Sequence, residues 1–116
     1  MSLPLILAAQ LLVGEQLSSV TFVQDYWQLH FDGSGFTVFS EIEVTGDGFT
    51  ARPGDESFRN RLCDRIATIL LDVRIVDDDL LLAFDDGCSL AISFTPRVGP
   101  EAFTFSVRGR SDIWVA

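Results

Sequence analysis

The sequence predicts an α+β domain of mostly antiparallel strands, in which a helix followed by three strands occurs twice and a β-hairpin closes the chain. Apolar positions recur at an offset of 53 residues, and they alternate with period 2 where strands are expected. The pairs Asp32-Gly33 and Asp86-Gly87 have the composition of hairpin turns. A chain of 116 residues has room for one hydrophobic core, so we expect a single domain over residues 1–116.

The first αβββ unit is expected over residues 2–45. Ser2 is a suitable N-cap for a helix with Pro4 in its first turn, and Gly14 follows the last apolar residue as a stop signal. Three strands follow this helix, because short apolar segments alternate with polar positions between turn residues. Their expected ranges are 17–24, 26–32 and 35–44.

The second unit is expected over residues 55–95, after a glycine-rich linker at 45–54. Asp55 is a suitable N-cap, and apolar residues from Phe58 to Ile69 recur at helical spacing with arginines outside the stripe. The strands of this unit are expected at 70–77, 79–84 and 88–95, and the C-terminal hairpin over 100–116 has strands at 101–107 and 111–115.

The two units align when the chain is shifted by 53 residues, with one extra residue needed after the Asp-Gly turn. The matched positions are hydrophobic in both units, which indicates an internal duplication. The alternative is that two amphipathic stretches of the same class align by chance. The clearest matched pairs are Trp27 with Leu80, Leu29 with Leu82, and Phe31 with Phe84.

The chain is strongly acidic. It has 17 Asp and Glu residues against eight basic residues, all of them Arg, which gives a formal net charge of −9. Binding to nucleic acid requires a dense cationic surface, so we expect no nucleic-acid partner. Catalytic side chains are sparse, and the sequence has no phosphate loop, nucleophile elbow or dinucleotide fingerprint. We therefore expect neither an enzyme nor a cofactor.

The segment from Leu3 to Val13 is apolar apart from one Pro and one Gln. It is too short to span a bilayer, and no basic residue precedes it as in a signal peptide, so we expect a structural helix in a cytoplasmic protein with no membrane partner. A signal peptide and a surface anchor are the alternatives. Cys63 and Cys88 lack a CxxC or His partner, which favours reduced thiols over a disulfide and excludes a zinc site within one chain.

Two groups of carboxylates are candidates for interaction with a partner. Asp77, Asp78 and Asp79 precede the strand 79–84, and Asp85 and Asp86 follow it. Five strand residues span about 17 Å, so the two groups cannot share one metal ion. Neither group has the spacing of a calcium loop. We expect turn carboxylates that favour solubility and form an acidic interaction surface, and no metal site.

Three residues are candidates for a pocket. His30 alternates away from the apolar face of its strand, Glu101 begins a strand after a Gly-Pro pair, and Trp114 lies in the last strand. A lone His without a visible nucleophile partner does not form a triad, so no catalytic residue is predicted. A surface or hydrogen-bonded His and a structural Glu are the alternatives.

The first helix is expected to be apolar on every side, including Leu11 and Leu12. Such a helix must be buried on every side, and one sheet covers only one face. We therefore expect homodimerisation through these leucines, with burial between two sheets of one chain as the alternative.

The Phe-Asp-Asp-Gly turn after Leu80, the Glu101-Ala102-Phe103 step and the Gly14-x-x-Leu17-x-x-Val20 entry resemble an uncharacterised family of small bacterial proteins. That family has a Glu-Ala-Trp step where this chain has Phe103, and a closing strand with a Trp. The resemblance covers most of residues 12–115 and implies no enzymatic activity. Some families of this size and charge are immunity proteins for secreted toxins, which is an analogy only.

These observations predict an acidic protein-binding module, in the manner of an immunity protein or inhibitor that covers a basic surface. One alternative is a small-ligand-binding or enzymatic domain with a pocket near His30 and Glu101. The other is a structural homo-oligomer.

Overall fold

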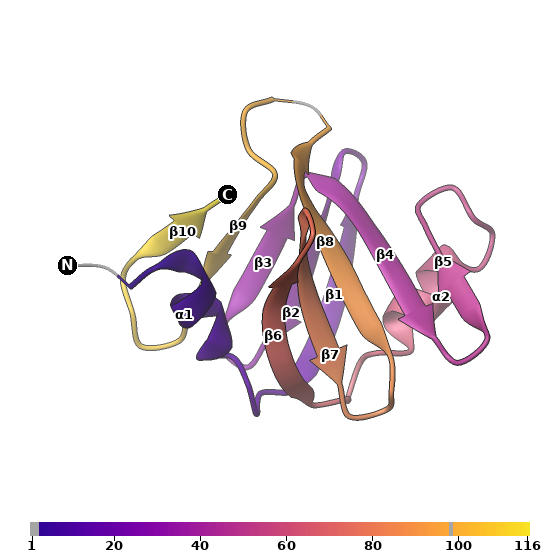
Figure 1. The fold of residues 1–116 in the computed structure, drawn as a ribbon, viewed down its shortest axis with the longest axis horizontal. Helices are drawn as coiled ribbons and strands as arrows, with labels where there is room; N and C mark the ends of the chain where they lie inside the picture. The colour runs from indigo at the N-terminus through magenta and orange to yellow at the C-terminus, as the bar shows by residue number, and fades with distance from the viewer. Residues whose placement is uncertain (1–2, 98) are drawn as a thin grey trace.

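The computed structural model describes residues 3–97 and 99–116. Two five-stranded antiparallel sheets lie face to face, with two short helices beside them (Figure 1). The first sheet has the order β1-β2-β3-β9-β10 and the second β5-β4-β8-β7-β6. The bounds are β1 Leu17–Val23, β2 Tyr26–Phe31, β3 Gly35–Val38, β9 Phe103–Ser106 and β10 Ile113–Val115, then β5 Phe49–Ala51, β4 Ser40–Gly46, β8 Ser89–Pro96, β7 Asp79–Phe84 and β6 Leu70–Val76.

Each sheet contains strands from both halves of the chain. The chain leaves the first sheet after β3, passes Phe39 and enters the second sheet as β4, which pairs with β8. It returns after β8 as β9, which pairs with β3. The Phe39 amide donates a hydrogen bond to the Ala102 carbonyl at 2.8 Å, so the two crossings lie side by side. Neither sheet is complete without the other half of the chain.

The helices are α1, Leu5–Gln10, and α2, Phe58–Cys63. Each contacts the first strand of the other half, α1 on β6 and α2 on β1. The bounds of α2, β6 and β7 lie 53 residues after those of α1, β1 and β2. β9 and β10 pair antiparallel, and the indole nitrogen of Trp114 on β10 donates to the Leu3 carbonyl at 2.9 Å.

The predicted mixture of helices and mostly antiparallel strands is confirmed, but several boundaries were wrong. The expected strand 35–44 is two strands in different sheets, and the expected linker 45–54 contains β5. Ser2 lies outside the described residues, and Pro4 is the N-cap of α1. Asp55 does not cap α2, because its Oδ2 accepts from the Arg52 amide at 2.8 Å and the N-cap is Ser57.

The core lies between the inner faces of the sheets and is rich in phenylalanine. Phe31 on β2 stacks with Phe84 on β7, with ring centroids 6.4 Å apart, and so joins the two sheets. Phe36 on β3 contacts Phe103 and Phe105 on β9 at 6.1 and 5.1 Å. These aromatic contacts join strands that are far apart in sequence.

Candidate interaction surface

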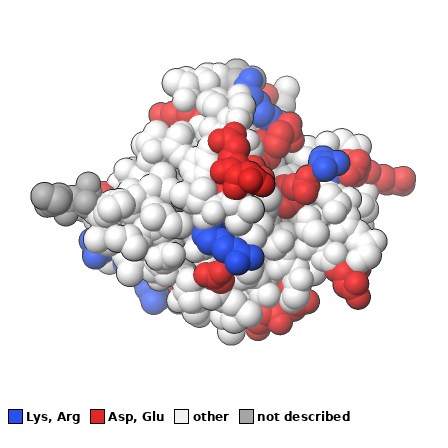
Figure 2. All heavy atoms as spheres, viewed as in Figure 1, with Lys and Arg blue, Asp and Glu red and all other residues white. Residues whose placement is uncertain are grey.

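Charged residues are segregated between the two sheets. The strands of the first sheet contain no Asp, Glu or Arg, whereas those of the second contain Glu41, Glu43, Asp72, Arg74 and Asp79. Figure 2 shows acidic side chains gathered on the face where β4, β8 and β7 lie. The outer face of the second sheet is therefore the polar, charged side of the molecule.

An acidic recess of about 310 Å³ lies on this face. Glu43 pairs in register with Ala91, and Asp79 pairs with Ser93, so the two carboxylates stand on either side of β8. The small side chains of β8 leave the space between them open. The lining residues are Glu41, Ile42, Glu43, Arg52, Pro53, Asp79, Ala91 and Ser93.

The electrostatics of the recess disfavour a negative charge on Asp79. Burial raises the pKa of Asp79 above its usual range, and the neighbouring carboxylates Asp78, Glu43 and Asp77 raise this pKa further. Among the described residues that line the recess, Arg52 is the one cation, and its Nε lies 2.7 Å from Glu43 Oε2. The Arg52 side chain is 68% exposed, so this ion pair is weak and open to exchange.

The two predicted Asp groups have different roles. Asp77 has a left-handed φ of 53° in the turn between β6 and β7, and Asp78 Oδ2 accepts from the Thr95 hydroxyl at 2.6 Å. Asp77, Asp78 and Asp79 thus stand around the end of β7 next to the recess. Within residues 3–97 and 99–116, no three His, Cys, Asp or Glu side chains are grouped as metal ligands would be.

At the other end of β7, the side chains of Asp85 and Asp86 form hydrogen bonds and an ion pair with neighbouring segments. Asp85 Oδ1 accepts from the Ile69 amide at 3.1 Å. Asp86 accepts from the Cys88 amide at 3.0 Å and forms an ion pair with Arg65 at 3.1 Å. The Arg65 side chain is only 8% exposed, so the Asp86 carboxylate stabilises a positive charge that is largely removed from water. Asp85 and Asp86 thus have contacts within the fold, although both remain exposed, and their part in an interaction surface stays a prediction.

The three predicted pocket residues do not come together. His30 lies on the outer face of β2, where its Nε2 is 3.1 Å from the Thr21 hydroxyl, and the hollow beside it is lined by neither Glu101 nor Trp114. Trp114 is buried and stacks on Phe105. His30 and Trp114 face opposite sides of the first sheet, so the structure does not bring these two residues together, and a pocket near His30 or Glu101 stays a prediction.

The two leucines predicted to form an interface differ in their exposure to solvent. Leu11 is 46% exposed, whereas Leu12 is fully buried in the core. Both leucines follow α1, which ends at Gln10 and not beyond Leu12 as expected. Leu7 and Leu11 are exposed, so two sheets of one chain do not enclose this segment, and homodimerisation stays a prediction. Cys63 and Cys88 are free thiols.

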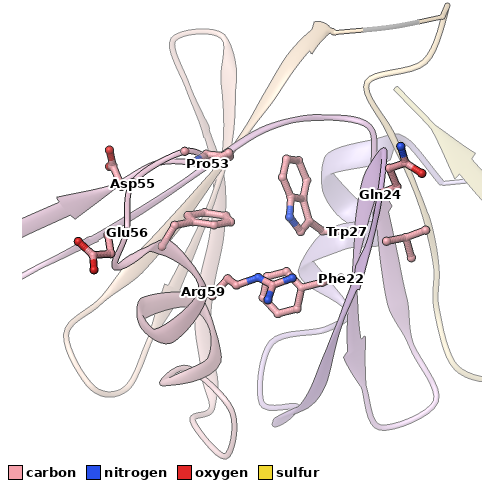
Figure 3. A pocket seen from close by; sticks show the side chains of 10 residues that line it. Phe22, Gln24, Trp27, Pro53, Asp55, Glu56 and Arg59 are labelled. Carbon is pink, nitrogen blue, oxygen red and sulfur yellow. The ribbon is translucent and has the colours of Figure 1, made fainter.

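Sequence reasoning missed a groove between α2 and the edge of the first sheet. It has a volume of about 450 Å³, and its walls include Phe22, Trp27, Phe58 and Pro53 (Figure 3). An aromatic residue in an alternating strand is usually a core residue, so the sequence holds no signal that separates these side chains from the other core aromatics.

Comparison with protein families, curated proteins and solved structures found no match to this chain. Among the described residues, neither helix is long or apolar enough to cross a bilayer.

Proposed function

We propose that this protein is an acidic protein-binding module, and that the recess between β4 and β7 binds a basic patch of a partner protein. The observation that carries the proposal is the crowding of Asp79 by Asp77, Asp78 and Glu43 beside a recess that small side chains leave open. A cation from a partner would relieve this repulsion. Solubility alone does not explain this crowding, because carboxylates spaced apart on the surface would make the protein equally soluble.

The net charge of −9 supports the same proposal. An acidic surface increases the association rate with a basic partner, and salt reduces this effect. The family resemblance adds an analogy with immunity proteins, which places toxin-like basic proteins among the partners to test. No catalytic activity is proposed.

The test compares variants of equal net charge. Wild-type protein, the pair Glu43→Gln with Asp79→Asn, and the control pair Asp47→Asn with Asp112→Asn are used as bait in host lysate at low salt. We expect one basic partner that is retained by the wild type and by the control and lost by the recess variant. Equal loss from both variants would mean that only total charge matters, and would contradict a specific site.

Asp79 also gives a prediction about stability. Because the pKa of Asp79 is raised in the folded state, the ionised group opposes folding above that pKa, and protonation relieves the penalty as the pH falls through it. Asp79→Asn is therefore expected to be more stable than wild type at pH 7, with a difference that vanishes below the ordinary pKa of 3.8. Thermal unfolding from pH 3 to pH 8 measures this difference. A less stable variant at pH 7 would show that the carboxylate has a structural role.

The sequence predicted two αβββ units and a separate C-terminal hairpin; we propose instead that the duplicated unit has five strands, αβββββ, and that the second copy includes this hairpin. The 53-residue spacing of α1, β1 and β2 from α2, β6 and β7 supports this origin. In this view β4–β5 and β9–β10 are equivalent hairpins, each donated to the sheet of the other half. An experimental structure in which residues 5–51 superpose on 58–115 by a two-fold rotation would support the duplication. Different strand orders in the two halves would contradict it.

A further inference from the structure

Two arginines lie over the aromatic rings beside α2: Arg59, which lines the groove, and Arg97, which lies outside its lining. Arg59 lies over the Phe22 ring at 4.9 Å, and Arg97 lies over the Trp27 ring at 4.8 Å. Arg97 donates to the backbone carbonyls of Asp25 and Phe39. No described carboxylate lies within ion-pair distance of either guanidinium.

Two acidic residues, Asp55 and Glu56, also line the groove. Figure 3 shows Asp55 and Glu56 directed away from the rings, while Phe22 and Trp27 face the side of α2 and the Arg59 side chain crosses the Phe22 ring. Asp55 already accepts a hydrogen bond from the Arg52 amide. The aromatic side of the groove is therefore reached by one guanidinium, that of Arg59, while the two carboxylates lie on its outer side.

The other half of the chain shows that packing alone does not require these residues. At the positions 53 residues away, Phe22 corresponds to Ile75, Trp27 to Leu80, Phe58 to Leu5 and Arg59 to Ile6. Those aliphatic residues occupy the same places in α1, β6 and β7. On the duplication proposed above, the matching corner at α1 forms with aliphatic residues, so the rings and the arginine beside α2 call for another explanation.

We propose that this groove binds a small ligand that has a flat aromatic ring and an anionic group. The ring lies against Phe22 and the small exposed part of Trp27, which is 9% exposed and has Arg97 over its ring, and the anion pairs with Arg59. A volume of about 450 Å³ is within the usual range for ligand sites. A guanidinium that already stacks on an aromatic wall keeps its N–H groups free to donate at its edge, where a carboxylate accepts two of them. This site shares Pro53 with the acidic recess but uses different charged residues, so each proposal can fail alone.

The experiment uses indole-3-acetate as the probe and neutral indole-3-acetamide as its isostere. Both are titrated into ¹⁵N-labelled protein, and the indole N–H signals of Trp27 and Trp114 are followed by NMR. We expect Trp27 to shift and Trp114, buried against Phe105 elsewhere in the first sheet, to stay in place. We also expect the acetate to bind more tightly than the amide. Equal affinity for the two probes, or no shift of Trp27, would overturn the proposal.

Three variants test which residue of the groove contacts the anionic group of the probe and which contacts its ring. Arg59→Gln is expected to weaken acetate binding about tenfold and to leave amide binding unchanged, because a charged hydrogen-bonded pair is lost. Arg61→Gln is the matched control, since Arg61 stacks on Phe49 at 3.9 Å outside the groove, and it should change neither affinity. Phe22→Ile copies the residue of the other half and should weaken both probes. An Arg61→Gln effect equal to that of Arg59→Gln would reduce the site to general charge attraction and contradict the assignment. Thermal unfolding of each variant verifies that it is folded.

Discussion

Replacing Asp86 by alanine is expected to lower the free energy of unfolding by about 3 kcal/mol, because it leaves the buried Arg65 guanidinium without its only anionic partner among the described residues. The Arg65 side chain is 8% exposed, and its Nε and Nη1 atoms have no hydrogen-bond partner beyond the ion pair with Asp86 at 3.1 Å. Asp86 is itself 28% exposed, which places the expected cost at the lower end of the range for broken buried pairs. Urea unfolding at pH 7 measures the change.

Two further variants separate the ion pair from other effects of Asp86. Asp112→Ala removes one exposed carboxylate that makes no described ion pair, and is expected to change stability by less than about 0.5 kcal/mol. Arg65→Met combined with Asp86→Ala removes the buried charge as well as its partner, and should recover most of the lost stability. If the double variant were no more stable than Asp86→Ala, the cost would come from the lost bond to the Cys88 amide and not from the unpaired charge.

This difference between Asp86 and Asp79 could not be predicted from the sequence. Both residues lie in short Asp runs beside the same strand, and both runs have the composition of turns. What distinguishes them is a partner distant in sequence: Arg65 reaches Asp86 from the turn after α2, whereas Glu43 on β4 adds a second negative charge near Asp79. The chemistry of each cluster is set by the tertiary fold.

Local pattern predicted the elements well and their partners poorly. The hairpin turns at Gly33 and Gly87 have φ of 82° in both cases, which is the conformation that favours glycine there. The division of the strand predicted at 35–44 had no local signal, because its inward positions continue in register from Phe36 through Ser40 to Val44. One polar residue marks the crossing: Ser40 is fully buried and donates to the Ser93 carbonyl at 2.6 Å. The change of sheet is decided by the pairing of β3 with β9 and of β4 with β8, which requires contacts across half of the chain.

The segregation of charge is also a tertiary property. Acidic residues occur in both halves of the sequence, yet the strands of the first sheet contain none. Alternation along one strand indicates which side chains face outward, but not which outward faces belong to the same sheet. The crossing at Phe39 sends Glu41 and Glu43 to the second sheet, where they meet Asp79. The candidate site is therefore assembled by the same exchange of strands that forms the fold.

The exchange of strands between the two halves of the chain should make the two sheets unfold together. Phe36→Ala is expected to lower the free energy of unfolding by about 3–5 kcal/mol, because the ring is buried and joins β3 of the first half to Phe103 and Phe105 of the second. Thr37→Ala, on the outer side of the same strand, is the control and should cost less than about 1 kcal/mol.

Because each sheet needs strands from both halves, the loss should appear as one transition shifted as a whole, not as unfolding of one half. Two probes test this expectation in urea: the fluorescence of Trp27 and Trp114 reports on the first sheet, and the reactivity of the buried Cys88 thiol reports on the start of β8 in the second. Coincident transitions in wild type and in Phe36→Ala are expected. Exposure of Cys88 at a different urea concentration from the fluorescence change would show that the sheets unfold separately, and that the exchanged strands do not make the two halves interdependent.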